Sequence, residues 1–192
     1  MTSDGHPALL TEAERAWLRD VAWRAVCAAA RGEPAPDPAQ VARERGLPED
    51  GRLREPRGAF VTLHEGPRLR GCIGTIVGRE PIGDAVAGSA RAAAVEDPRF
   101  PPVCADELSN LAFEVSALTP LVEVDGPGAI ELGRHGILLS KEGRQAVFLP
   151  QVAPEQGWDL PTTLGQLCRK AGLAPDAWRQ GARLQVFEAE VF

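Results

Sequence analysis

The sequence lacks any hydrophobic run long enough for a membrane helix, which needs roughly 20 consecutive apolar residues. Its first residues also lack the basic and apolar stretches of a secretory signal. The hydrophobic and charged fractions, 44% and 25%, are those of an ordinary soluble globular chain. We therefore expect a cytoplasmic protein that does not associate with membranes.

Patterns typical of metal sites and disulfide scaffolds are missing as well. The cysteines lie far apart and form no CxxC pair, and the three histidines form no HxH or HExxH motif. We expect reduced thiols, no metal and no cofactor. The four cysteines are Cys27, Cys72, Cys104 and Cys168.

An excess of basic charge is also missing, because the formal net charge is -6. Binding to nucleic acid through its phosphates needs a positive field, so we expect no nucleic-acid partner. A local pair of arginines can still hold a small anion.

The chain of 192 residues contains a mixture of helix and strand patterns that fits one domain, 1–192, and its length allows that domain to be divided into two lobes. Thr11 and Glu14 form a capping box before a helix that Gly32 ends. Hairpins imply antiparallel pairing, so we predict an α+β fold with helices packed on a largely antiparallel sheet. Further helices are expected within 39–46, 80–97 and 160–172, hairpins within 59–77 and 136–152, strands at 111–118 and 183–192, and an exposed loop at 47–58.

The first predicted hairpin contains the most unusual stretch of the sequence, GPRLRGCIGTIVG. In a regular strand, Arg68, Arg70, Cys72 and Gly74 point to one face. A neighbouring guanidinium favours the nucleophilic thiolate, so Cys72 is the best candidate for a reactive thiol. The missing side chains at Gly71 and Gly74 would let a ligand approach the backbone.

Two interpretations of this strand stay open, a catalytic or ligand-binding site and an ordinary packed strand. The second fits because free cysteines often pack as small hydrophobic residues and strand glycines often mark bulges. A four-residue hairpin loop pairs His64 with Leu69 and puts the histidine on the face opposite Cys72, unless a bulge intervenes. His135, in a glycine-flanked turn, is the alternative proton shuttle. Glu114 fits a solvent-facing carboxylate, with a catalytic use only if it reaches the same cleft.

Five stretches of the sequence are distinctive when taken together, at residues 69–75, 97–103, 114–120, 148–159 and 167–173. In this order they resemble the AMMECR-one domain family, and the resemblance covers nearly the whole chain. It implies a cytosolic α+β protein of two unequal lobes, with the LRGCIG segment near the groove between them. The molecular function of that family is not established, although a catalytic role has been suspected for this segment.

The resemblance also implies partners, because bacterial and archaeal relatives are grouped with a Memo-like protein, similar to class III extradiol dioxygenases, and a radical SAM enzyme. We expect an enzyme or enzyme subunit that binds a small anionic metabolite at Arg68, Arg70, Gly71 and Gly74. Cys72 and His135 are its candidate catalytic residues. The alternative is a non-catalytic scaffold or binding module for the Memo-like or radical SAM partner.

Overall fold

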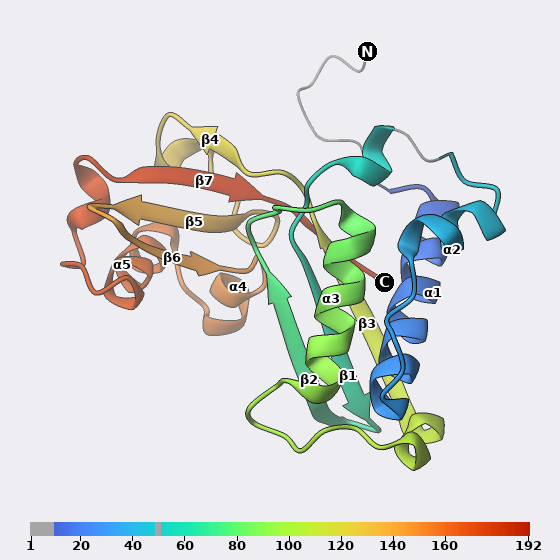
Figure 1. Cartoon of the computed structure of the whole chain (residues 1–192). Helices are drawn as coiled ribbons and strands as arrows, with labels where there is room; N and C mark the ends of the chain where they lie inside the picture. The colour runs from blue at the N-terminus through green and yellow to red at the C-terminus, as the bar shows by residue number, and fades with distance from the viewer. Residues whose placement is uncertain (1–9, 49–50) are drawn as a thin grey trace. The chain divides into compact units, whose positions relative to one another are not determined.

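The computed structural model describes residues 10–48 and 51–192, which contain two antiparallel sheets together with helices (Figure 1). This confirms the predicted α+β class. Unit 1 contains the residues up to Pro120 together with Glu190–Phe192, and unit 2 contains Leu121–Ala189. Whether the two units make up one domain stays a prediction. His6 and residues 49–50 of the predicted loop lie outside the described residues.

Unit 1 is built on a sheet with the strand order β2-β1-β3-β8, in which β2 is an edge strand. The last strand is held to β3 by Val115 and Phe192, whose backbones exchange two hydrogen bonds with N–O distances of 2.9 and 3.1 Å. The end of the chain therefore completes the first sheet. The strands are β1 (Ala59–Glu65), β2 (Arg68–Thr75), β3 (Leu111–Leu118) and β8 (Ala189–Val191).

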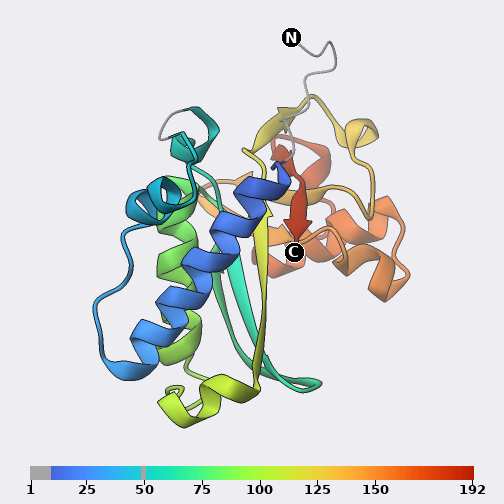
Figure 2. The same ribbon diagram turned by 90° about the vertical axis from the view of Figure 1, so that its right-hand side faces the viewer.

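Two long helices, α1 (Glu12–Arg31) and α3 (Ile82–Val95), lie across one face of this sheet (Figure 2). On β1, the buried Ala59, Val61 and Leu63 alternate with half-buried side chains and join the same hydrophobic core as both helices. We call the face turned away from these helices the Cys72 face. The residues of β1, β2 and β3 that the register places on this face are Phe60, Thr62, His64, Leu69, Cys72, Gly74, Ala112, Glu114 and Ser116.

The capping box predicted for α1 is present, since Thr11 Oγ1 accepts from the Glu14 amide at 3.3 Å and Glu14 Oε2 accepts from the Thr11 amide at 2.6 Å. Gly32 ends the helix in the left-handed conformation, with φ 70°. Trp23 packs on the sheet, where it stacks on Phe113 with ring centroids 5.5 Å apart. The shorter elements of unit 1 are α2 (Pro38–Glu44) and the 3-10 turns η1 (Gly51–Arg54) and η2 (Ala105–Asn110).

A β-bulge interrupts the hairpin of β1 and β2. Leu63 pairs with Gly71 and His64 pairs with Leu69, so Arg70 is the extra residue. An extra residue reverses the alternation of side chains on the two sides of the bulge. Arg68 pairs with Glu65 and shares the helix-covered side of β1, whereas Cys72 lies on the other side. The expected single face for the two arginines and the thiol is therefore wrong.

Unit 2 contains the second sheet, with the strand order β4-β7-β5-β6. Its core joins buried residues of the sheet, such as Ile137 and Leu139, to Leu164, Leu167 and Cys168 of α5. The strands are β4 (Val122–Val124), β5 (Gly136–Lys141), β6 (Arg144–Phe148) and β7 (Arg183–Phe187). The helices and turns are α4 (Val152–Gln156), α5 (Leu160–Lys170), η3 (Pro127–Ala129) and η4 (Ala177–Arg179).

Two local predictions need correction. The final segment, expected as one strand over 183–192, forms two strands in different sheets that are separated at Glu188. The segment 47–58 is not a uniformly exposed loop, because Arg57 is 2% exposed and donates to Glu55 at 3.1 Å. Within the described residues, every helix is too short or too polar to cross a membrane.

Candidate functional site

Cys72 lies directly opposite Thr62 in the β1–β2 pairing. The Thr62 hydroxyl donates to the Cys72 sulfur, with an Oγ1–Sγ distance of 3.3 Å. The thiol is half-buried rather than enclosed. Thr62 is therefore in direct contact with the atom at which chemistry at Cys72 would take place.

The outer edge of β2 at Cys72 is covered by the segment that follows α3. The Cys72 amide donates to Asp97 Oδ2 at 2.9 Å, and Arg99 Nη2 donates to the Cys72 carbonyl oxygen at 3.2 Å. These contacts replace the hydrogen bonds that a further strand would make to an edge strand. Because the amide and carbonyl of Cys72 point outward, Cys72 and Thr62 form a non-hydrogen-bonded pair, in which side chains lie closest.

Asp97 and Arg99 form a tight pair beside this edge. Arg99 donates to both carboxylate oxygens, with distances of 2.9 Å from Nε and 2.6 Å from Nη2. The Arg99 hydrogen bonds hold the pKa of Asp97 well below its usual value despite the burial of the carboxyl group, and the Cys72 amide lowers it further. The Asp97 side chain is 2% exposed and that of Arg99 is 53% exposed. A charged guanidinium therefore lies at the surface beside Cys72.

Arg70, the bulged residue, is turned to a different neighbour. Its Nε and Nη2 donate to Glu107 at 2.8 and 3.1 Å, and its Nη1 donates to the Pro101 carbonyl at 2.9 Å. The Arg70 hydrogen bonds and the Cys104 amide lower the pKa of Glu107 to about 2. All three guanidinium nitrogens are used, so Arg70 braces the strand against η2. Ligand binding by Arg68 and Arg70 stays a prediction.

Close packing explains both glycines of the strand. A Cβ at Gly71 would lie 2.1 Å from the Ala93 carbonyl oxygen of α3. A Cβ at Gly74 would lie 2.2 Å from the Ala59 carbonyl oxygen and 2.4 Å from the Phe60 ring. The space expected for a ligand along these directions is therefore filled by the protein itself. Contact of a ligand with the glycine backbone stays a prediction.

The bulge brings His64 onto the Cys72 face. In the register without a bulge, His64 would lie on the opposite side of the sheet. Glu114 on β3 pairs with Thr62 on β1, which pairs with Cys72 on β2, so these three side chains form one row across the strands. His64 lies two residues beyond Thr62. A thiol, a hydroxyl, an imidazole and a carboxylate thus share one face.

His135 belongs to unit 2, in the turn before β5. Its Nδ1 accepts a hydrogen bond from the Glu131 amide at 3.0 Å, and its own amide donates to the Glu131 carbonyl at 2.9 Å. His135 therefore closes a local turn through Nδ1, which leaves Nε2 for other contacts. Its role as a proton shuttle for Cys72 stays a prediction.

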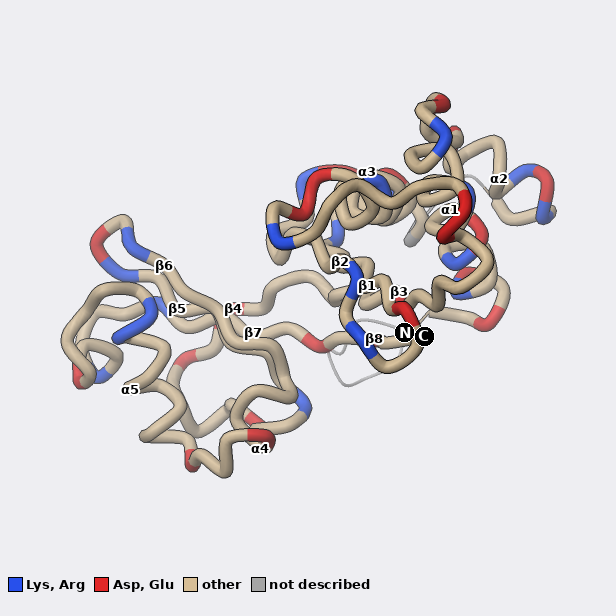
Figure 3. The backbone as a smooth tube through the Cα atoms, turned by 90° about the horizontal axis from the view of Figure 1, so that it is seen from below, with Lys and Arg blue, Asp and Glu red and all other residues tan. Residues whose placement is uncertain are grey.

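The sequence did not reveal three contacts of Cys72, which are made by Thr62, Asp97 and Arg99. Asp97 and Arg99 belong to DPRFPPV, one of the five stretches that carry the family resemblance, and no role was expected of either residue. An acidic and a basic residue two positions apart, directly after a helix, were the available signal. Basic and acidic residues are both spread over each of the two units (Figure 3).

Comparisons with known proteins find similar sequences and a similar structure over most of the chain. The family model described as AMMECR1 matches residues 20–192. A protein of Methanosarcina barkeri is 46% identical over 143 residues, which cover 72% of this chain and 71% of that protein. A protein of Methanocaldococcus jannaschii is 43% identical over 149 residues, covering 73% and 74%. The crystal structure of an uncharacterized protein from Pyrococcus horikoshii is similar, with a TM-score of 0.74, 35% identity, and coverage of 95% and 92%.

Proposed function

This chain belongs to the AMMECR1 family, and we propose that its Cys72 face is a small-molecule site of a cytoplasmic enzyme or enzyme subunit. Cys72 acts there as nucleophile or proton donor toward a small anionic metabolite. The observation that carries the proposal is the Thr62 hydroxyl, which donates to a half-buried sulfur at 3.3 Å. The hydroxyl is close enough to the sulfur to contact a group that the sulfur binds.

Arg99 takes the anion-binding role that the sequence suggested for Arg70. Arg70 uses all its guanidinium nitrogens within the protein, whereas Nη1 of Arg99 makes no hydrogen bond to the described residues. An exposed guanidinium held in one orientation by Asp97 can bind a carboxylate or phosphate group of a ligand. Asp97 therefore fixes the orientation of the Arg99 guanidinium and also holds β2 through the Cys72 amide.

His64 and Glu114 are the groups we propose to carry the proton of the reaction. When the Cys72 sulfur adds to a carbonyl carbon of the ligand, the π electrons of that C=O bond move to its oxygen, and the thiol proton passes to one of these two side chains. Both lie on the Cys72 face by strand register. His135 remains the alternative proton carrier.

The proposal is tested by comparing a neutral and an anionic alkylating reagent, iodoacetamide and iodoacetate, at Cys72. Peptide mass spectrometry gives the rate for each cysteine separately. We expect Thr62→Val to slow both reagents about five-fold, because about 1 kcal/mol of hydrogen bonding is lost. We expect Arg99→Gln to slow iodoacetate more than iodoacetamide, and Arg99→Lys to restore part of this preference.

Ser116→Ala serves as the matched control, because Ser116 lies on the same face but is not paired with Thr62 or Cys72. It should leave both rates unchanged. If Cys72 stays unmodified in the folded protein, or if Thr62→Val and Arg99→Gln behave like the control, the catalytic proposal is wrong. An unreactive Cys72 together with co-purification of a Memo-like or radical SAM protein would instead favour the scaffold function.

A further inference from the structure

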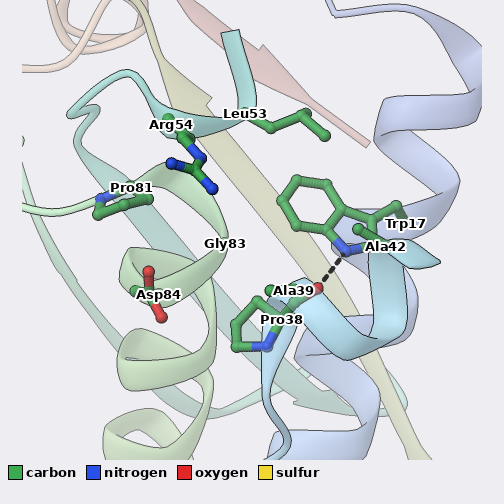
Figure 4. Close-up of a pocket in the computed structure, with 9 residues that line it drawn as sticks. All are labelled: Trp17, Pro38, Ala39, Ala42, Leu53, Arg54, Pro81, Gly83 and Asp84. Carbon is green, nitrogen blue, oxygen red and sulfur yellow. Dashed lines mark hydrogen bonds between the residues drawn. The ribbon is translucent and has the colours of Figure 1, made fainter. Parts of the chain in front are cut away.

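A cavity of about 390 Å³ lies between the helices of unit 1, but its aromatic ring and its arginine are already engaged (Figure 4). The Trp17 ring is 2% exposed, and its Nε1 donates to the Pro38 carbonyl oxygen at 3.0 Å. Arg54 also has an interaction within the protein. Cations without an acidic partner gather instead on unit 2.

Unit 2 has seven basic residues, and five of them form no ion pair within residues 10–48 and 51–192. The other two, Arg134 and Arg183, pair with glutamates at 3.1 and 2.7 Å. The acidic residues beside the five in the chain, Glu142 and Asp176, leave three positive charges in excess. A positive excess in a chain with a net charge of -6 favours an anionic partner at this place. The five cations are Lys141, Arg144, Arg169, Lys170 and Arg179.

Two of these cations flank the turn between β5 and β6, where they are directly paired across the hairpin. Like charges at paired positions cost stability. Lys141 Nζ donates to the carbonyl oxygens of Ala177 and Gln180, on either side of η4, at 3.2 and 2.8 Å. Arg144 Nη1 donates to the Gly172 carbonyl oxygen just after α5, while its Nε and Nη2 make no hydrogen bond to the described residues. Neutral carbonyl groups orient these cations without neutralising them, so both can still pair with an anion.

The same turn begins an open edge of the second sheet, because β6 is an edge strand. The two-residue turn joins Lys141 and Arg144 as a hydrogen-bonded pair, so the amide and carbonyl groups of Gln145 and Val147 point away from β5. Lys170 Nζ donates to the outward Val147 carbonyl at 2.9 Å. The outward groups of Gln145 have no hydrogen-bond partner in the described part of the chain. An edge of this kind can accept a further strand.

We propose that the outer edge of β6 binds an extended acidic segment of a partner protein. The segment adds to the sheet as a strand, with backbone hydrogen bonds to Gln145 and to the Val147 amide. Its residues opposite Gln145 point away from α5 and are neutral, and the alternate residues point to the α5 side and are acidic. On that side they meet Arg144, which reaches the end of α5, and Lys170, whose Nζ lies 5.0 Å from the Phe148 ring centroid.

The open edge favours a protein over other polyanions. Nucleic acid and anionic lipid can pair with the cations, but neither has a strand backbone that could use the outward amides of β6. The site belongs to unit 2, whereas Cys72 belongs to unit 1. This inference is therefore independent of the proposed function.

NMR amide spectra of the isotope-labelled chain, titrated with three short peptides, test the proposal. The first peptide alternates Glu and Thr, the second has Gln in place of Glu, and the third repeats the first with N-methylated Thr amides. We expect the first to shift the Gln145 and Val147 amide signals and to bind about ten-fold more tightly than the second, because two exposed charge pairs are lost. The third should bind at least as weakly as the second, since its strand cannot pair. Unchanged Gln145 and Val147 signals, or equal affinity for the three peptides, would overturn the proposal.

Variants separate the contributions of charge and backbone. Arg144→Gln and Lys170→Gln should each weaken the Glu peptide about three-fold and leave the Gln peptide unchanged. Arg134→Gln is the matched control, because it removes the same charge from unit 2 at a residue that is already ion-paired. Gln145→Pro removes the outward amide donor, which an edge strand tolerates, and should abolish binding of both peptides.

Thermal melting and the unperturbed amide spectrum check that each variant is folded. If Arg144→Gln and Lys170→Gln bind the Glu peptide as tightly as Arg134→Gln does, the assigned charge contacts are wrong. If Gln145→Pro folds and still binds, the segment lies elsewhere and the proposal is wrong. Oligothymidylate and phosphatidylserine vesicles should bind more weakly than the Glu peptide. Tighter binding of either would show that the cations serve another class of partner and would overturn the proposal.

Discussion

At the scale of single residues, Cys72 obtains its surroundings from segments that are far apart in the sequence. Thr62 contacts the sulfur from β1, while Asp97 and Arg99 hold the backbone from the segment after α3. Sequence spacing singled out Cys72 and paired it with Arg70, whose guanidinium donates to Glu107 instead. A bulge cannot be seen in a pattern of alternating residues, so the wrong guanidinium was assigned to the thiol.

Asp97→Asn should lower the stability of the protein near neutral pH by about 2 kcal/mol, because a buried charged hydrogen-bond acceptor is lost. The pKa of Asp97 is lowered in the folded state, so its stabilising effect is present above about pH 4, the value for an unfolded chain, and is lost as the pH falls further. The difference in unfolding free energy between the two proteins should therefore narrow below pH 4.

Urea unfolding of wild-type protein and Asp97→Asn at several pH values measures this difference. Glu96→Gln is the matched control, because the Glu96 carboxylate, next to Asp97 in the chain, is exposed and pairs with the exposed Arg91. A difference that stays constant from neutral pH to about pH 2 would show that Asp97 does not act through its charge.

At the scale of elements, β2 is held in a different way on each of its sides. One edge pairs with β1, the other is covered by Asp97 and Arg99, and the helix-facing side contacts α3 at Gly71. The helix α1 was predictable because its capping signals are local in sequence. The division of the final segment between two sheets depends on tertiary pairing, which leaves no local signal.

The contact of β2 with α3 predicts a large effect of a single methyl group. Gly71→Ala should destabilise the protein by about 2 kcal/mol, since its Cβ would overlap the Ala93 carbonyl oxygen. Gly88→Ala, within α3, is the matched control, because its Cβ would meet nothing within 4 Å. This second change should stabilise the helix by up to about 1 kcal/mol. Equal effects of the two changes in chemical unfolding would contradict the proposed packing.

At the scale of the whole molecule, each unit has its own hydrophobic core. The core of unit 1 includes Leu18 and Leu63, and the core of unit 2 includes Leu139 and Leu164. The α+β class and the antiparallel pairing followed from hairpin patterns in the sequence. The boundary between the units did not follow from these hairpin patterns. The chain leaves the first sheet after β3 and returns to it only with β8.

Separate cores predict separate local stabilities. Leu164→Ala should cost about 3 kcal/mol and accelerate amide hydrogen exchange in β5 and β7 roughly 100-fold. Exchange in β1 should change little, and Leu63→Ala should have the reverse pattern. Hydrogen exchange followed by NMR distinguishes the strands. Equal acceleration in both sheets for either variant would show that the two cores unfold together.

The measurement that tests the catalytic site most directly is the order in which the four cysteines of the folded protein react with iodoacetamide. Cys104 is exposed, Cys72 and Cys27 are half-buried, and Cys168 is buried. Exposure alone places Cys104 first. We predict that Cys72 reacts first because of the Thr62 hydroxyl at its sulfur. Reaction of Cys104 first, with Cys72 modified only after unfolding, would show that Cys72 is a packed residue rather than a nucleophile.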